Sequence, residues 1–144
     1  MTLNHAIPTK FQCVERGTDE GLTLLRRGLD ALRLTGAELR LPFYFGLLAE
    51  VCALSGRMEE ALANVASGFA FQTKNGERWS EPELHRIHGE VLLRTGNNSG
   101  ARLSYGRAIE AARSLGARML EIRAEASLRE LPGADKTRRN AAEQ

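Results

Sequence analysis

Two histidines close together in the chain are the residues best suited to bind a ligand. His85 and His88 are three positions apart and Glu81 precedes His85 by four, so a helix would place all three side chains on one face. Imidazole and carboxylate groups are common zinc ligands. The set lacks the second glutamate and the flanking pattern of the H-E-x-x-H zinc motif, and packing or helix capping is the favoured explanation. We therefore predict no metal and no cofactor, and keep a small-ligand or metal sensor built on these three residues as the alternative function.

A row of alternating charges lies on the same segment. Glu83, Arg86, Glu90 and Arg94 recur at intervals of three, four and four residues, which places them along one side of a helix. A solvated face with mutual ion pairs is sufficient to explain this pattern. In helical repeat proteins such a face can also line a concave groove that holds a partner peptide. The row is therefore a candidate recognition surface.

Residues suited to covalent catalysis are not arranged in any recognisable motif. No Ser/His/Asp or Cys/His combination lies in a pattern that would activate a nucleophile. The phosphate-binding pattern G-x-x-x-x-G-K-[ST] is absent as well. We expect a protein that is not an enzyme. The aromatic residues Phe43, Tyr44, Phe45 and Trp79 are expected to pack between helix hairpins rather than form a ligand cage.

Composition predicts a soluble, cytoplasmic protein of one domain. The 144 residues carry 20 basic and 18 acidic side chains, a net charge of +2. They form no basic stripe of the kind that nucleic-acid binding requires. Cys13 and Cys52 lie far apart, and no N-terminal signal segment is visible. The longest uncharged segment, 61–73, is shorter than the roughly 20 residues that span a bilayer. We expect neither nucleic-acid nor membrane partners.

The chain repeats itself at an interval of 40 residues. Gly36, Gly76 and Gly116 follow this spacing. Six further columns share it: Pro42 and Pro82; Glu50 and Glu90; Gly56 and Gly96; Gly21, Ala61 and Ala101; Gly28, Gly68 and Ala108; Leu29, Phe69 and Ile109. Glycine takes positive φ at a helix end and proline suits a helix start, so these columns predict helix boundaries. Glycine and alanine within helical segments indicate close approach of neighbouring helices.

The apolar pattern predicts a fold made only of helices. Apolar residues recur at intervals of three and four, and no segment alternates as a strand would. The expected helices cover residues 18–34, 42–55, 58–73, 80–95, 98–114 and 117–131. We predict an all-α fold, a right-handed α-solenoid of antiparallel helix hairpins over residues 17–131. A partly ordered stub at 1–16 and a flexible tail at 132–144 flank it. Solenoid ends without polar caps could pair two copies as a homodimer.

The segment GRMEEA, Gly56–Ala61, followed by Val65 and Gly68, resembles the second half of a tetratricopeptide repeat. His88 departs from the family, because it occupies an apolar position. The period departs too, since the standard repeat has 34 residues. The six extra residues fall in the second helix and in the connection around Gly76. HEAT-type repeats, with periods near 40 residues, are the alternative fold.

A longer resemblance covers residues 17–131. It is similar to the C-terminal repeat region of large bacterial signalling proteins that join a class III adenylate or guanylate cyclase domain, or a regulator domain, to a predicted ATPase. The segments that carry it are LRRGLDALRLTGAELRLPFYFGLLAEV, GERWSEPELHRIHGEVLLRTG and ARLSYGRAIEAARSLGARMLEIRAEASL. The resemblance implies a regulatory arm that binds a protein or peptide in a groove lined by the first helix of each hairpin. The predicted groove positions are Phe43, Gly46, Glu50, Ala53, Glu83, Arg86, Glu90 and Arg94.

Overall fold

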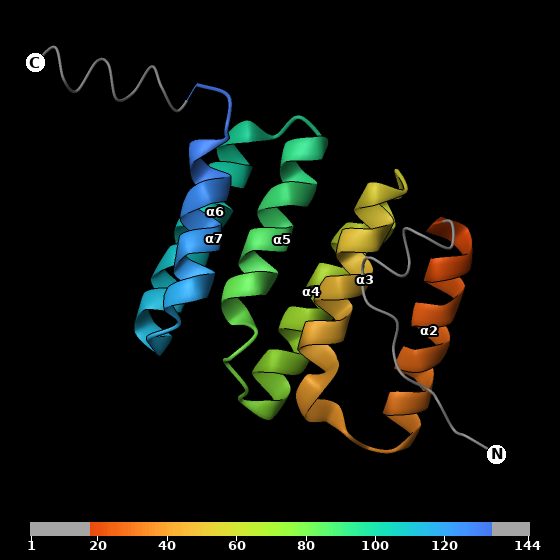
Figure 1. The fold of residues 1–144 in the computed structure, drawn as a ribbon. Helices are drawn as coiled ribbons and strands as arrows, with labels where there is room; N and C mark the ends of the chain where they lie inside the picture. Colours follow the sequence, from red (N-terminus) through yellow and green to blue (C-terminus); the bar gives the residue numbers. More distant parts are fainter. Residues whose placement is uncertain (1–17, 134–144) are drawn as a thin grey trace, which may run out of the picture. The chain divides into compact units, whose positions relative to one another are not determined.

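A computed structural model describes residues 18–133, and this part of the chain is all-helical (Figure 1). It contains six α-helices, one short 3-10 helix and no strand. The elements are α2 (Thr18–Leu34), η1 (Glu38–Arg40), α3 (Leu41–Leu54), α4 (Met58–Asn75), α5 (Glu81–Arg94), α6 (Asn98–Leu115) and α7 (Arg118–Arg129). The predicted all-α class is confirmed, and each predicted helix end lies within two residues of the observed one. The predicted stub, and the predicted tail beyond Gly133, lie outside the described residues.

The chain divides into two compact units whose boundary in the sequence falls between Ser80 and Glu81. In the first unit, α3 packs against both α2 and α4. In the second unit, α6 packs against α5 and α7, and α5 also contacts α7. Within each unit, consecutive α-helices run in opposite directions (Figure 1). None of the helices in residues 18–133 combines the length and apolar character needed to cross a membrane.

Three helix connections share one turn geometry. Gly56, Gly96 and Gly116 follow α3, α5 and α6 with φ angles of 80°, 85° and 66°. In each turn the glycine amide donates to the carbonyl three residues earlier, and the next amide donates to the carbonyl five residues earlier. This is the Schellman pattern, which satisfies the last carbonyls of a helix and requires a left-handed residue. Glycines of two repeat columns, Gly56 with Gly96 and Gly116, therefore end helices, as predicted.

Helix starts also agree with the sequence. Pro42 and Pro82 are the second residues of α3 and α5, where an amide donor has no partner within the helix. At the start of α6, Asn97 Oδ1 accepts a hydrogen bond from the Gly100 amide at 2.9 Å. Such caps satisfy one of the donors that a helix leaves open. The local sequence is thus sufficient to place each of these starts.

Small residues allow close helix packing in both units. Ala61 and Ala101, which share one repeat column, are fully buried. The tightest contact lies in the second unit, where a Cβ atom added at Gly89 would lie 2.6 Å from Cε1 of Tyr105. The tyrosine ring therefore lies directly against the backbone of α5. Close approach explains why a glycine is kept inside this helix despite its low helix propensity.

Candidate functional site

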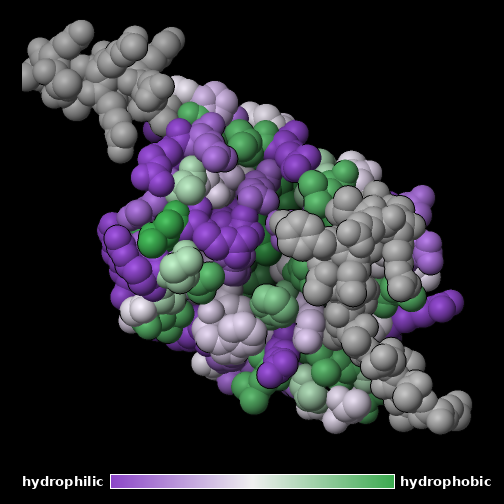
Figure 2. Space-filling view, viewed as in Figure 1, coloured by the Kyte–Doolittle hydropathy of each residue, from purple (hydrophilic) through white to green (hydrophobic). Residues whose placement is uncertain are grey.

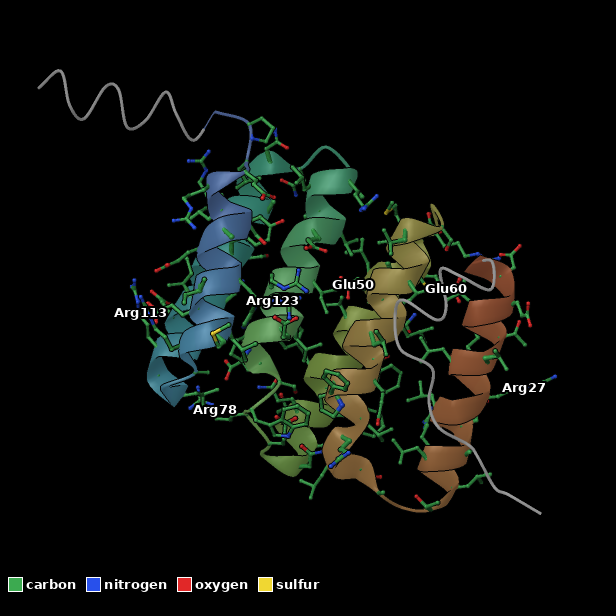
Figure 3. All side chains as sticks on the ribbon, viewed as in Figure 1. Arg27, Glu50, Glu60, Arg78, Arg113 and Arg123 are labelled. Atoms are coloured by element: carbon green, nitrogen blue, oxygen red, sulfur yellow. The ribbon has the colours of Figure 1, made fainter. Side chains whose placement is uncertain are left out.

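Four predicted groove positions lie on α3 and differ in exposure. Phe43 is 40% exposed and Glu50 is half-buried, whereas Gly46 and Ala53 are buried. Figure 3 labels Glu50 on this helix. Among these four, Phe43 and Glu50 present side-chain surface that a partner could reach. Partner binding by this row stays a prediction.

The other four predicted groove positions lie on α5, and three of them, Glu83, Arg86 and Glu90, form an ion-pair network. Arg86 donates to Glu83 at 2.9–3.2 Å and also to Glu90. From α7, Arg123 approaches Glu83 at 3.4 Å (Figure 3). Arg94, at the end of the row, is exposed. The pairing agrees with the charge pattern of the sequence.

The expected solvation of this row is wrong for one residue. Arg86 is only 4% exposed, because carboxylates one turn before and one turn after it hold its guanidinium group. A buried charge is tolerated when it is paired and hydrogen-bonded in this way. Arg86 therefore stabilises α5 and offers little surface to a partner.

The histidines are directed to different partners. His85 Nε2 lies 3.8 Å from Glu81 Oε1, whereas His88 Nδ1 lies 3.3 Å from the Ser104 hydroxyl of α6. Within residues 18–133, no three His, Cys, Asp or Glu side chains are arranged to hold a metal ion. The three residues of the alternative function are therefore not brought together as a metal site.

Burial favours the neutral form of both histidines. Burial lowers the pKa of His85 below its ordinary value of 6.5, and the carboxylate of Glu81 partly opposes this effect. Burial also lowers the pKa of His88, and the positive charge of Arg107 lowers it further. Neutral imidazoles suit packing between α5 and α6 rather than the binding of anions.

Buried thiol and phenol groups in the described chain are chemically quiet. Cys52 is fully buried, and burial raises the pKa of its thiol to about 11. The thiolate is the nucleophilic form, so Cys52 is unreactive at neutral pH. Burial similarly raises the pKa of Tyr105 to about 12. Neither residue is poised for nucleophilic attack.

A hollow in the first unit gathers exposed aromatic side chains. Its volume is about 670 Å³, and it lies between η1, the first turn of α3 and the segment after α4. Its lining residues are Leu39, Arg40, Phe43, Tyr44, Asn75, Gly76, Glu77 and Trp79. Phe43 and Trp79 stack with ring centroids 5.7 Å apart, yet Trp79 remains 48% exposed. Phe45 is buried against Phe71, as expected for a packing residue, whereas Trp79 packs on Phe43 and keeps about half of its surface exposed.

Hydrogen bonds hold the walls of this aromatic hollow. The Asn75 amide donates to the backbone carbonyl of Glu38 at 2.9 Å and thereby joins the end of α4 to η1. The buried Glu77 carboxylate accepts from the amide and hydroxyl of Ser80 at 2.8 and 2.9 Å. Trp79 lies between these two residues in the chain. The aromatic hollow is therefore formed by a fixed connection.

The surface of the molecule is mixed in character. In the view of Figure 2, hydrophilic side chains predominate over the second unit, with separate hydrophobic patches between them. Exposed large apolar side chains occur in both units: Leu34, Leu39, Phe43, Leu54, Trp79, Leu103, Leu115, Met119 and Ile122. Three of them, Leu39, Phe43 and Trp79, line the aromatic hollow. This grouping distinguishes the hollow from the other exposed apolar residues.

Comparison with known proteins identifies a relative of undescribed role. The chain is 34% identical over 116 residues to an uncharacterized protein of Rhizobium meliloti (strain 1021). The match covers 80% of this chain but 11% of the relative. The chain therefore spans about a tenth of the length of the curated relative it matches. No family model and no solved structure matches.

Proposed function

We propose that this chain is a non-catalytic protein-interaction module, a right-handed tetratricopeptide-type solenoid that binds a peptide or a neighbouring domain. The observation that carries the proposal is the recurrence of one helix hairpin, closed by the same glycine turn after α3 and after α5. Stacked hairpins of this kind build extended binding surfaces. The proposed setting is the cytoplasm.

The proposed role is that of a regulatory arm in a larger bacterial signalling protein. The similarity to a protein nine times as long as the matched segment supports such a setting. The resemblance to repeat regions linked to cyclase and ATPase domains supports it further. In this role the module supplies surface complementarity, and the chemistry belongs to other domains.

A peptide-display screen on the intact chain tests the proposed function. We expect enrichment of a shared sequence motif, and weaker capture by Glu50→Arg and Arg94→Glu, since both positions have accessible side chains. Arg27→Glu is the matched control, because Arg27 is an exposed residue of α2 outside the predicted groove (Figure 3). Failure to enrich any motif would count against a peptide-binding module. Equal capture by all variants would reject this groove assignment.

Pairing of two copies is a second contact that the proposed solenoid could make. Met119 and Ile122 on α7 are 71% and 39% exposed, and their spacing places them on one face of the helix. A second copy would cover these side chains and form a homodimer. Light scattering across a concentration series should then show a mass that doubles, and Ile122→Asp should restore the monomer. A constant monomer mass would exclude the dimer.

A further inference from the structure

We propose that the aromatic hollow of the first unit is a docking site for a short acidic peptide segment that presents a bulky apolar side chain. The inference rests on the proposed function in one respect, that the partner is a peptide. It adds the location of the contact and the chemistry of the partner. Of the predicted groove positions, Phe43 alone lines this site.

The apolar half of the partner follows from the exposed walls. Leu39 is 64% exposed, and Phe43 and Trp79 present their stacked rings to the same hollow. Exposed apolar groups that gather in a concavity mark binding sites more often than scattered ones do. Tryptophan and other aromatic anchors also carry much of the energy at protein interfaces. A leucine or phenylalanine side chain of the partner would cover these three residues.

The acidic half follows from the charges around the hollow. Lys74 is paired with Glu38 at 3.1 Å. Glu77 is buried, and its two oxygens accept hydrogen bonds from Ser80. Arg40, by contrast, lines the hollow with an exposed side chain and forms no ion pair within residues 18–133.

Arg40 is therefore the exposed charge of the hollow that is left for a partner, whereas the carboxylate of Glu77 keeps its negative charge but is only 7% exposed and accepts from Ser80. The planar guanidinium group of Arg40 binds a carboxylate through two parallel hydrogen bonds. An acidic residue next to the apolar anchor would satisfy this geometry. A basic segment would instead meet an exposed positive charge.

Rigidity makes the hollow suited to a short ligand. The hydrogen bonds from Asn75 and Ser80 already hold the connection that carries Trp79. Binding then orders little of the protein, so less of the interaction energy is lost to conformational entropy. A peptide of a few residues can therefore bind measurably.

The only tryptophan of the sequence reports directly on this site. Trp79 is the single tryptophan, so a change in its fluorescence on titration reports occupancy of the hollow. The probes are three peptides of equal length, acetyl-Asp-Phe-Asp-Leu-amide, acetyl-Lys-Phe-Lys-Leu-amide and acetyl-Asp-Ser-Asp-Ser-amide. We expect a saturable change with the first peptide. The basic peptide should bind at least about threefold more weakly, as expected for a lost exposed ion pair. The apolar-free peptide should also bind more weakly, because it lacks the side chains that would cover Leu39, Phe43 and Trp79.

Matched variants separate charge from apolar contact. Arg40→Glu should weaken the acidic peptide by about threefold or more, as expected for a reversed surface pair, and favour the basic one. Arg27→Glu makes the same change of charge on α2 and should leave both unchanged. Leu39→Ser should weaken the binding of both Phe-containing peptides to the same extent. Because Leu39 is highly exposed, this substitution should leave the fold intact.

The outcomes distinguish this inference from the proposed function. A basic peptide that binds as well as the acidic one, or an Arg40→Glu variant without effect, would overturn the docking site. A silent Trp79 combined with peptide binding detected by calorimetry would also overturn it, yet leave the interaction module intact. Trp79 emission that changes with protein concentration alone would assign the hollow to a second copy. No binding of any of the three peptides by either method would overturn the docking site, whereas the proposed function is decided by the peptide-display screen.

Discussion

The contact between Gly89 and Tyr105 shows how one residue can govern the packing of a hairpin. Tyr105 is 1% exposed, and its ring lies against the α5 backbone at Gly89. The equivalent positions 40 residues earlier are Ala49 and Val65, a larger and a smaller residue, and both are buried. Each repeat therefore combines one large and one small residue at this pair of positions. The first hairpin has alanine and valine at this pair of positions, whereas the second has glycine and tyrosine.

Gly89→Ala should destabilise the protein. Overpacking costs about 1–3 kcal/mol, and the greater helix propensity of alanine returns up to about 1 kcal/mol. We expect the free energy of unfolding to fall by about 1–2 kcal/mol in urea titrations. Gly106→Ala is the control, because a Cβ there meets no atom within 4 Å and should be neutral or stabilising. Equal effects at the two glycines would refute the contact.

The lowered pKa values of His85 and His88 predict that acid destabilises the protein. In the folded state these imidazoles have pKa values below 6.5, so the unfolded chain binds more protons once the pH falls below that value. The urea midpoint should therefore be constant above about pH 7 and fall as the pH drops below the ordinary histidine pKa of 6.5. The double variant His85→Gln/His88→Gln should lose most of this dependence. A wild-type midpoint that rises on acidification would contradict the sign.

The helix hairpins owe their turns to glycine. At Gly56, Gly96 and Gly116 the backbone is left-handed, a conformation that side chains with a Cβ adopt only at a cost. The two hydrogen bonds of the Schellman pattern require this conformation. One glycine therefore sets where α5 ends and how the chain returns into α6.

Replacing a turn glycine should weaken its hairpin without disturbing the core. Gly96→Ala has no steric clash but forces alanine to a φ of 85°, which should cost about 1 kcal/mol. Gly96→Asn should cost less, because asparagine tolerates the left-handed region. Thermal unfolding of the two variants measures the difference. An alanine variant as stable as the asparagine variant would show that the turn relaxes.

The division at Ser80 and Glu81 predicts that the two units respond separately to core damage. Each unit has its own buried leucines, such as Leu25 in α2 and Leu84 in α5. Proteins often open in contiguous cooperative segments that follow such compact units. A destabilising substitution in one core should therefore increase local opening mainly within that unit.

Hydrogen exchange measured by mass spectrometry tests this prediction on the full chain. Gly89→Ala should accelerate amide exchange in α5, α6 and α7 and leave α2, α3 and α4 nearly unchanged. Leu25→Ala should have the reverse effect, since it removes a fully buried side chain from the first unit. A uniform increase across both units in either variant would show that they open together.

The helices could be predicted from the sequence because their signals are local. Gly96 ends one helix through its own φ preference, and Pro82 starts another through its missing amide donor. The 40-residue period then places the same signals around Gly56 and Pro42. Such features depend on residues within one turn of each other. This is why the predicted and observed boundaries agree so closely.

Which side chains remain exposed depends on contacts between segments far apart in the sequence. The residue pattern within one helix carries no information about those contacts. The aromatic hollow needs η1, α3 and the connection after α4 to meet, and neither Phe43 nor Trp79 carries a local sign of its exposure. The position of Trp79 outside the expected helices is the one feature of the sequence that points to its exposure. Spacing predicted the charged row on α5 and its ion pairs, but the low exposure of Arg86 was not apparent from that spacing. Residues near in sequence therefore determine the helices, whereas packing in three dimensions determines which side chains remain available to a partner.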